Sequence, residues 1–208
     1  MKLVALGATG GSGMEIVGKA LDMGHSVTAF VRTPDKLSKF GDRITTVRGN
    51  LLNTNELAQV LEGHDAVVSG FGPRYPVSKA DAHLLQLFSV ALTGAMRLAR
   101  IRRVVIESVA FLFKNSILPP AYLLGRLFFS GIVDDASAME DVFERSGLDW
   151  TLVRPPALTD KPYTGKYRIG VGHLPRLGLS ISRADVADFI VKAVEDPSSI
   201  GRIFGIAN

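Results

Sequence analysis

The sequence predicts a single-domain α/β protein with a doubly wound, mostly parallel sheet and helices on both faces. Three observations lead to this fold class. Short apolar runs alternate with stretches of helical spacing along the chain. The length of 208 residues suits one domain. With 47% hydrophobic residues, the chain can bury a full core without disulfides or metals.

In the first half, strands alternate with helical or turn segments. Residues 3–6 form a short apolar run that stops at glycines, which predicts a buried strand. Residues 14–23 predict a helix, because Gly24 stands just past their end. Further strands are predicted at 26–31, 44–47 and 66–69.

The second half continues this alternation and then changes. Residues 79–100 carry apolar side chains at helical spacing, which predicts a long helix before a strand at 104–106. Ser146 and Gly147 end a helix predicted at 136–145, and two prolines stop a strand at 150–153. The remaining predictions are short strands at 167–169 and 177–181, a helix at 183–194 and a last strand at 203–206.

The composition excludes several chemistries. The chain contains no cysteine, which excludes disulfides, thiolate metal sites and a cysteine nucleophile, and which fits a reducing, cytoplasmic location. Its four histidines show no metal-ligand spacing, so no metal is expected.

Charge and hydropathy argue against nucleic-acid and membrane partners. The net charge is +4, and the basic residues are scattered rather than gathered in a stripe. The most apolar later stretch, residues 117–133, is short and is broken by Pro119, Pro120 and Arg126. We therefore expect no nucleic acid and no membrane, and a monomer or a homodimer.

The loop after the first predicted strand reads Gly-Ala-Thr-Gly-Gly-Ser-Gly over residues 7–13. In a dinucleotide-binding loop, Gly7 would allow the sharp turn, Gly10 the approach of backbone to a pyrophosphate, and Gly13 close helix–strand packing. The N–H groups at the helix start would face the phosphates. A glycine-rich turn without a ligand is the less favoured alternative. The expected cofactor-binding residues here are Gly7, Thr9, Gly10, Gly11, Ser12 and Gly13.

The end of the second predicted strand bears on which dinucleotide binds. NAD-specific sites usually place an acidic residue there, to bind the ribose 2′-hydroxyl. This chain has Arg32, whose guanidinium can bind a 2′-phosphate, and Lys36 could assist. NADP is therefore favoured over NAD, the alternative being that Arg32 is only a solvated loop residue.

The chain as a whole resembles the atypical short-chain dehydrogenase/reductase group, a Rossmann-fold family, and within it the small NmrA-like and biliverdin-reductase-B (flavin reductase)-like members. The glycine loop, residues 24–32 and residues 146–156 carry the resemblance, together with residues 181–187. Residues 108–112 and 158–167 are similar to the flavin-reductase branch in particular.

The resemblance implies further cofactor contacts at the ends of other strands. Gly70, Phe71 and Gly72 would lie along the adenosine ribose and pyrophosphate, and Asn50 and Leu51 would flank the adenine, although the family usually has Asp in place of Asn50. On the nicotinamide side, the implied residues are Ser108, Val109, Pro155, Pro156 and Ala157. Segments at about 109–135 and 155–182 would cover the substrate.

Catalytic candidates are fewer. Orthodox members use a Tyr-x-x-x-Lys pair with a Ser. Ser108 fits the Ser position, but Tyr75 and Lys79 belong to a loop that contains Pro76, so we interpret their spacing as coincidence. Tyr122, with Arg126 four residues on, is a second candidate, although it could instead belong to a pocket lid.

Three further observations bear on the chemistry. Glu107 ends a buried strand, where it could be a structural ion-pair partner or, with a raised pKa, a proton donor. Val109 and Ala157 stand where the flavin-reductase branch has Ser and His, which argues against biliverdin as substrate. An apolar pocket, or alternatively core or an oligomer contact, is expected from Phe111, Leu112, Phe113, Leu118, Tyr122, Leu123 and Phe128.

These observations favour an NADPH-dependent oxidoreductase that transfers hydride to a flavin, a quinone or another planar or carbonyl acceptor. The alternative is a non-catalytic NAD(P)-binding redox sensor of the NmrA kind, supported by the missing Tyr/Lys pair. A relative of sugar-nucleotide epimerases or dehydratases is less favoured, because the C-terminal part is short.

Overall fold

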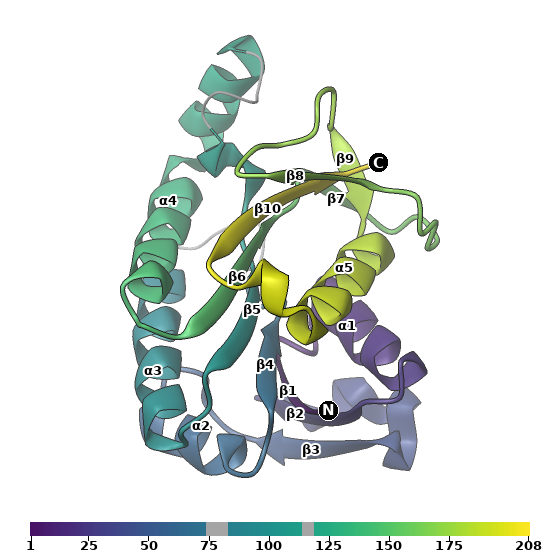
Figure 1. Cartoon of the computed structure of the whole chain (residues 1–208), viewed down its shortest axis with the longest axis vertical. Coiled ribbons are helices and arrows are strands. Elements are labelled where there is room, and N and C mark those ends of the chain that lie inside the picture. Colours follow the sequence, from purple (N-terminus) through teal and green to yellow (C-terminus); the bar gives the residue numbers. More distant parts are fainter. Residues whose placement is uncertain (74–82, 114–118) are drawn as a thin grey trace.

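The computed structural model describes residues 1–73, 83–113 and 119–208, with the backbone alone over 119–129. Within these residues, eight strands form one sheet in the order β3-β2-β1-β4-β5-β6-β10-β8, and β7 and β9 form a separate pair (Figure 1). All neighbours from β3 to β10 run parallel, and β8 is antiparallel to β10. The single-domain α/β fold with a mostly parallel sheet is thereby confirmed.

The first half of the chain builds one side of the sheet. The order in which strands are added reverses between β1 and β4, which lie side by side and parallel. Such a reversal leaves a crevice beyond the carboxyl ends of the two strands, where open α/β sheets bind ligands. The elements are β1 (Lys2–Leu6), α1 (Gly11–Asp22), β2 (Ser26–Val31), the 3₁₀ segment η1 (Pro34–Arg43), β3 (Ile44–Arg48), α2 (Thr54–Leu61) and β4 (Ala66–Ser69).

The second half extends the sheet in the other direction and adds the small β7–β9 pair. Its elements are α3 (Leu84–Leu98), β5 (Arg103–Glu107), η3 (Ala110–Leu112), α4 (Pro119–Glu144), β6 (Asp149–Arg154), β7 (Ala157–Thr159), β8 (Arg168–Val171), β9 (Ser180–Ser182), α5 (Arg183–Glu195), η4 (Pro197–Ser199) and β10 (Arg202–Ala207).

Helices cover the sheet on both faces, and two apolar cores result. In β1, Leu3 and Ala5 face the core beneath α1 and α5, whereas Val4 and Leu6 face the core beneath α2, α3 and α4. All four side chains are buried, because alternate residues of a strand point to opposite faces and both faces are covered. The central strands are therefore mostly apolar on both faces, which is why they were predictable from short apolar runs.

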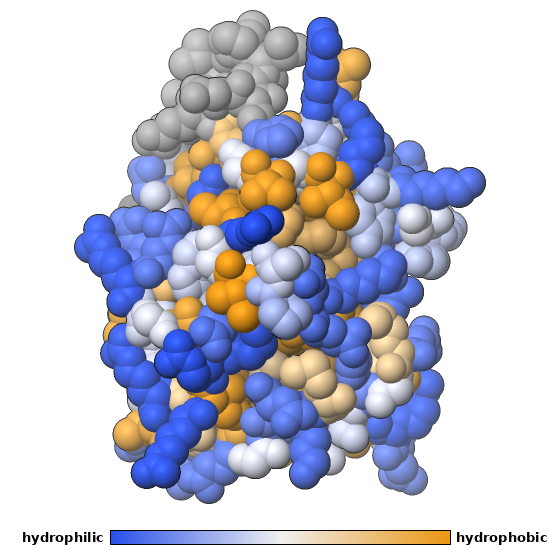
Figure 2. Space-filling view, in the orientation of Figure 1, coloured by the Kyte–Doolittle hydropathy of each residue, from blue (hydrophilic) through white to orange (hydrophobic). Residues whose placement is uncertain are grey.

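The edge formed by β10 and β8 is less fully covered. Figure 2 shows apolar side chains gathered over β8 and β10 on the viewed face. The exposed large apolar residues of this part of the chain are Ile169, Val171, Leu177 and Leu179.

Among the residues described, no helix combines the length and apolar character needed to cross a bilayer.

The structure corrects three predicted boundaries. The helix predicted at 136–145 is the last part of α4, which begins at Pro119; proline is tolerated in a first turn, where N–H groups have no intrahelical partner. The strand predicted at 177–181 is observed at Ser180–Ser182. It does not begin at Leu177, because this residue has φ +57°, a left-handed turn conformation. The strand predicted at 167–169 runs instead from Arg168 to Val171.

The helix predicted at 79–100 is observed as α3 from Leu84, and residues 79–82 lie outside the described residues. Its amino end is capped from another helix. The backbone N–H groups of Leu85 and Gln86 donate to the carboxylate of Asp135 in α4, at 2.8 and 3.0 Å. This buried carboxylate joins α3 to α4.

Candidate functional site

The glycine loop between β1 and α1 is packed too tightly for side chains at two of its positions. Gly7 has φ +70°, and a Cβ on it would lie 2.6 Å from the Phe71 backbone nitrogen. A Cβ on Gly13 would lie 2.1 Å from the Gly7 carbonyl oxygen. That oxygen accepts a hydrogen bond from the Gly10 N–H at 2.9 Å. The turn and the helix–strand packing expected of Gly7 and Gly13 are therefore present.

Two adjoining cavities open beside this loop, of about 270 and 320 Å³. Both are lined by Gly7, Thr9, Arg32 and Phe71, so the loop, the end of β2 and the end of β4 border one hollow at the carboxyl edge of the sheet. The first is also lined by Gly10, Gly70, Gly72, Pro73 and Leu84, and the second by Phe30, Val31, Thr33 and Leu51.

The structure thus brings together residues from four different strand ends that were expected around the adenosine and pyrophosphate. Phe71 is held by its neighbour Phe88, with ring centroids 4.7 Å apart. Arg32 is exposed at the rim of both cavities. Asn50 is exposed, and its Oδ1 accepts from the Leu52 N–H at 3.0 Å, so this oxygen shapes the turn beside Leu51.

Gly11 and Ser12 begin α1 and face neighbours rather than the two cavities. A Cβ on Gly11 would lie 2.7 Å from Nε of Arg183, the first residue of α5. Ser12 is buried, and its hydroxyl donates to Glu107 Oε1 at 3.1 Å. Ser12 therefore orients a buried carboxyl below the loop.

Glu107 ends β5 beneath the start of α1. Its Oε2 is buried and has no hydrogen-bond partner among the described residues. Burial raises the pKa of Glu107 to about 7, and the Ser12 hydrogen bond and the charge of Arg183 offset only part of that rise. The carboxyl is therefore poised to change its protonation near neutral pH, at the base of the loop.

Ser108 follows Glu107 and faces the other side of the sheet. Its hydroxyl donates to Glu140 Oε1 of α4 at 2.5 Å. The guanidinium of Arg154, at the end of β6, binds the same carboxylate through both of its oxygens, with Nε 3.0 Å from Oε1 and Nη2 against Oε2. Arg154 also lies over the Phe113 ring, 4.6 Å from its centroid. Ser108, Glu140 and Arg154, all largely buried, form one polar cluster.

The other residues expected near the nicotinamide lie beside this cluster. The Ala110 N–H, one residue past Val109, donates to the Pro155 carbonyl at 3.0 Å, so the segments after β5 and β6 run together. Pro155 is buried, Pro156 half-buried and Ala157 exposed, at the start of β7.

Of the expected pocket-lining apolar residues, Phe113 is buried in a small core with Ala110 and Leu174. Phe113 therefore occupies a core position, which was the alternative to lining a pocket. Phe111 and Leu112 are half-buried. The side chains of Tyr122, Leu123, Arg126 and Phe128, and residues 75, 79 and 118, lie outside what the structure describes.

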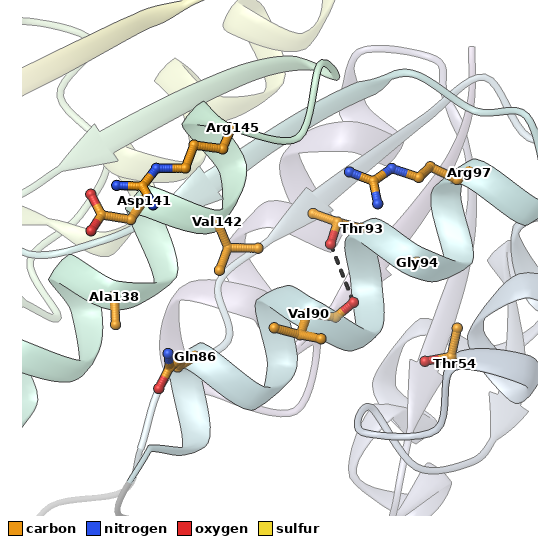
Figure 3. Close-up of a pocket in the computed structure, with 10 residues that line it drawn as sticks. All are labelled: Thr54, Gln86, Val90, Thr93, Gly94, Arg97, Ala138, Asp141, Val142 and Arg145. Atoms are coloured by element: carbon orange, nitrogen blue, oxygen red, sulfur yellow. Dashed lines mark hydrogen bonds between the residues drawn. The ribbon is translucent and has the colours of Figure 1, made fainter.

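A separate and larger cavity, about 660 Å³, lies between α2, α3 and α4, away from the glycine loop. Figure 3 shows Arg97 and Arg145 on its rim and Val90 and Val142 between them. None of its lining residues was expected at the cofactor site. Over the described residues, no group of His, Cys, Asp and Glu side chains could hold a metal ion.

Sequence reasoning missed Glu140, Arg154 and Arg183. Glu140 lies 32 residues from Ser108 along the chain, and the contact depends on how α4 packs. The available signal was weak. Glu140 is a charged residue at an apolar helix position, and Arg154 directly follows the strand predicted at 150–153.

A doubly wound sheet with a tight glycine loop and a hollow at its reversal point defines a dinucleotide-binding protein of the Rossmann type. The NAD(P)H-binding family model matches residues 7–197, and the chain belongs to this family. The expected resemblance to atypical short-chain dehydrogenases/reductases is confirmed at the level of the family, whose members include reductases.

Three relatives illustrate the range of the family. An uncharacterized chloroplastic protein of Arabidopsis thaliana is 31% identical, over 99% of this chain and 76% of its own length. A reductase of Aspergillus terreus is 26% identical, over 88% of each chain. A solved structure from Burkholderia pseudomallei, of a protein described as exported, is 26% identical, with a TM-score of 0.82 over the whole of both chains.

Proposed function

We propose that the protein is an NADPH-dependent reductase that transfers hydride to a flavin, a quinone or a similar planar acceptor. The observation that carries the proposal is the hollow beside the glycine loop, which has Arg32 rather than a carboxylate at its rim. A guanidinium there attracts the 2′-phosphate of NADP, which a carboxylate would repel.

Each part of the site has a defined task in this proposal. Gly10 lets the pyrophosphate approach the backbone, Gly7 and Gly13 permit the turn and the close helix packing around it, and the free N–H groups at the start of α1 bind it. Phe71 and Leu51 contact the adenosine, and Pro155, Pro156 and Ala157 cover the nicotinamide. The bound dinucleotide supplies the hydride.

The net reaction with flavin mononucleotide would be NADPH + FMN + H⁺ → NADP⁺ + FMNH₂, with two electrons passing as hydride and the proton coming from solvent. Such an acceptor needs little from the protein beyond alignment with the nicotinamide. Tyr122 stays a predicted participant. A cytoplasmic location and a monomeric or homodimeric state also stay predictions.

The test is a titration with NADPH and NADH, followed by absorbance at 340 nm after addition of FMN or a simple quinone. Gly10→Asp places a negative charge where the pyrophosphate would lie and should abolish NADPH binding. Gly131→Asp is a matched control on α4, because a Cβ on Gly131 meets no atom of the described residues within 4 Å.

Arg32→Ala should weaken NADPH binding about tenfold and leave NADH binding unchanged, since one charge-assisted contact is worth roughly 1.5–3 kcal/mol when formed in full. Arg176→Ala, at an exposed arginine that lines neither cavity, is its control. Tight binding without turnover on any acceptor would favour the redox sensor instead, and absence of dinucleotide binding would overturn both functions.

A further inference from the structure

The hydroxyl proton of Ser108 is already engaged inside the protein. A serine hydroxyl carries one proton and two acceptor lone pairs. That proton points to Glu140 Oε1 at 2.5 Å, in a place where Ser108 is 8% and Glu140 3% exposed. Only the lone pairs of Ser108 are left for a ligand.

Arg154 fixes the direction of this hydrogen bond. Its guanidinium donates to both oxygens of Glu140, and an arginine cannot act as an acceptor. Glu140 is therefore the acceptor in each of its contacts with these two side chains. The ring of Phe113 packs against the guanidinium and keeps it in place.

Acceptors of hydride differ in what they need from such a hydroxyl. When an aldehyde or ketone receives hydride at carbon, negative charge develops on its oxygen, and a nearby O–H donor lowers the barrier. When a flavin receives hydride, the charge spreads over a conjugated ring that solvent can protonate, so no protein hydroxyl is required.

We propose that Glu140 and Arg154 are positioning residues that hold Ser108 as a hydrogen-bond acceptor and thereby select flavin-like acceptors over aldehydes and ketones. This inference rests on the proposed reductase function. It assigns Ser108 the task of accepting an N–H hydrogen bond from the bound molecules, rather than polarising a carbonyl oxygen.

The experiment compares NADPH oxidation by FMN and by 4-nitrobenzaldehyde in four proteins. They are the wild type, Ser108→Ala, the double variant Glu140→Leu/Arg154→Met, and the triple variant that combines all three changes. The double variant replaces the ion pair by apolar groups of similar volume, which proteins often tolerate without loss of stability. Circular dichroism and NADPH binding check that each variant is folded.

In the wild type, FMN should be reduced at least tenfold more efficiently than the aldehyde. Ser108→Ala should lower FMN reduction and aldehyde reduction by similar factors, because it removes an acceptor for the bound molecules but no donor to the carbonyl oxygen. In the double variant, the freed hydroxyl should raise aldehyde kcat about tenfold with little change in KM. Adding Ser108→Ala to the double variant should remove the whole gain. A structural role alone would not make the effect of Ser108→Ala depend on the pair.

Arg154→Lys keeps a cation beside Glu140 and should retain the wild-type preference, which provides a second test if the double variant does not fold. A loss of aldehyde reduction in Ser108→Ala alone that exceeds the loss of FMN reduction tenfold or more would overturn the inference while leaving the reductase function intact. A wild type that oxidises NADPH with neither acceptor would overturn the proposed function itself.

Discussion

Glu107 couples the glycine loop to pH. Its folded-state pKa, about 7, lies above the ordinary glutamate value, because burial penalises the ionised carboxylate. A carboxyl of this kind contributes fully to stability below its ordinary pKa, and its contribution is lost as the pH rises through 7. The unfolding free energy should therefore fall by up to about 1.4 kcal/mol per pH unit between the ordinary pKa of 4.5 and pH 7.

Glu107→Gln removes this ionisation and keeps the shape of the side chain. The unfolding free energy of the variant minus that of the wild type should rise by ~3 kcal/mol from pH 4.5 to pH 8. Urea unfolding at both pH values measures the difference. Glu15→Gln, at an exposed position of α1, should show no such trend. An equal wild-type-to-Gln difference at both pH values would contradict this account of Glu107.

The helices and strands differ in how far the sequence determined them. The glycine loop and the central strands were predictable because their signals are local: three spaced glycines after an apolar run, and short stretches buried on both faces. The start of α4 was missed because its first turn contains two prolines. The strand predicted from Leu177 failed because alternation alone does not reveal a left-handed turn.

The candidate site divides in the same way. Residues that border the hollow next to their own strand ends, such as Arg32 and Gly70, follow from strand order and the family resemblance. The cluster of Ser108, Glu140 and Arg154 requires α4 to pack against the ends of β5 and β6, which no local pattern specifies.

Asp135 makes the α3–α4 pair a testable case of such long-range dependence. Asp135→Ala leaves the first N–H groups of α3 without their acceptor and should cost about 1–2 kcal/mol of unfolding free energy. Thermal and urea unfolding measure the loss. Asp141→Ala, an exposed change on the same helix, should cost less than about 0.5 kcal/mol, and equal losses in the two variants would contradict the capping role.

The glycine loop and the contacts that join the sheet to α5 lie at opposite ends of the strands. Arg103 begins β5, at the end of the sheet opposite the glycine loop. Its guanidinium donates to the carbonyls of Val194 and Asp149 at 3.2 and 2.7 Å and to the Ser199 hydroxyl at 2.7 Å. One side chain thus joins β5 and β6 to the carboxyl end of α5, where a positive charge also favours the helix dipole.

Arg103→Met should therefore lower the unfolding free energy by about 3 kcal/mol, because several buried carbonyls lose their donor. The folded variant should bind NADPH within twofold of the wild type, as measured by fluorescence titration. Arg102→Met is the control, since Arg102 is 64% exposed and its pair with Asp149 is worth less than about 1 kcal/mol. A large loss of NADPH affinity in Arg103→Met would contradict the separation of the two ends.

The position of Arg183 has a consequence for how the chain moves. It lies against Gly11 at the start of α1, and its Nη1 pairs with Asp160, just after β7, at 2.6 Å. Segments more than 140 residues apart thus share one guanidinium. A ligand seated on the glycine loop would therefore also restrain the β7–β9 pair through Arg183, and amide hydrogen exchange in that pair would slow when the loop is occupied.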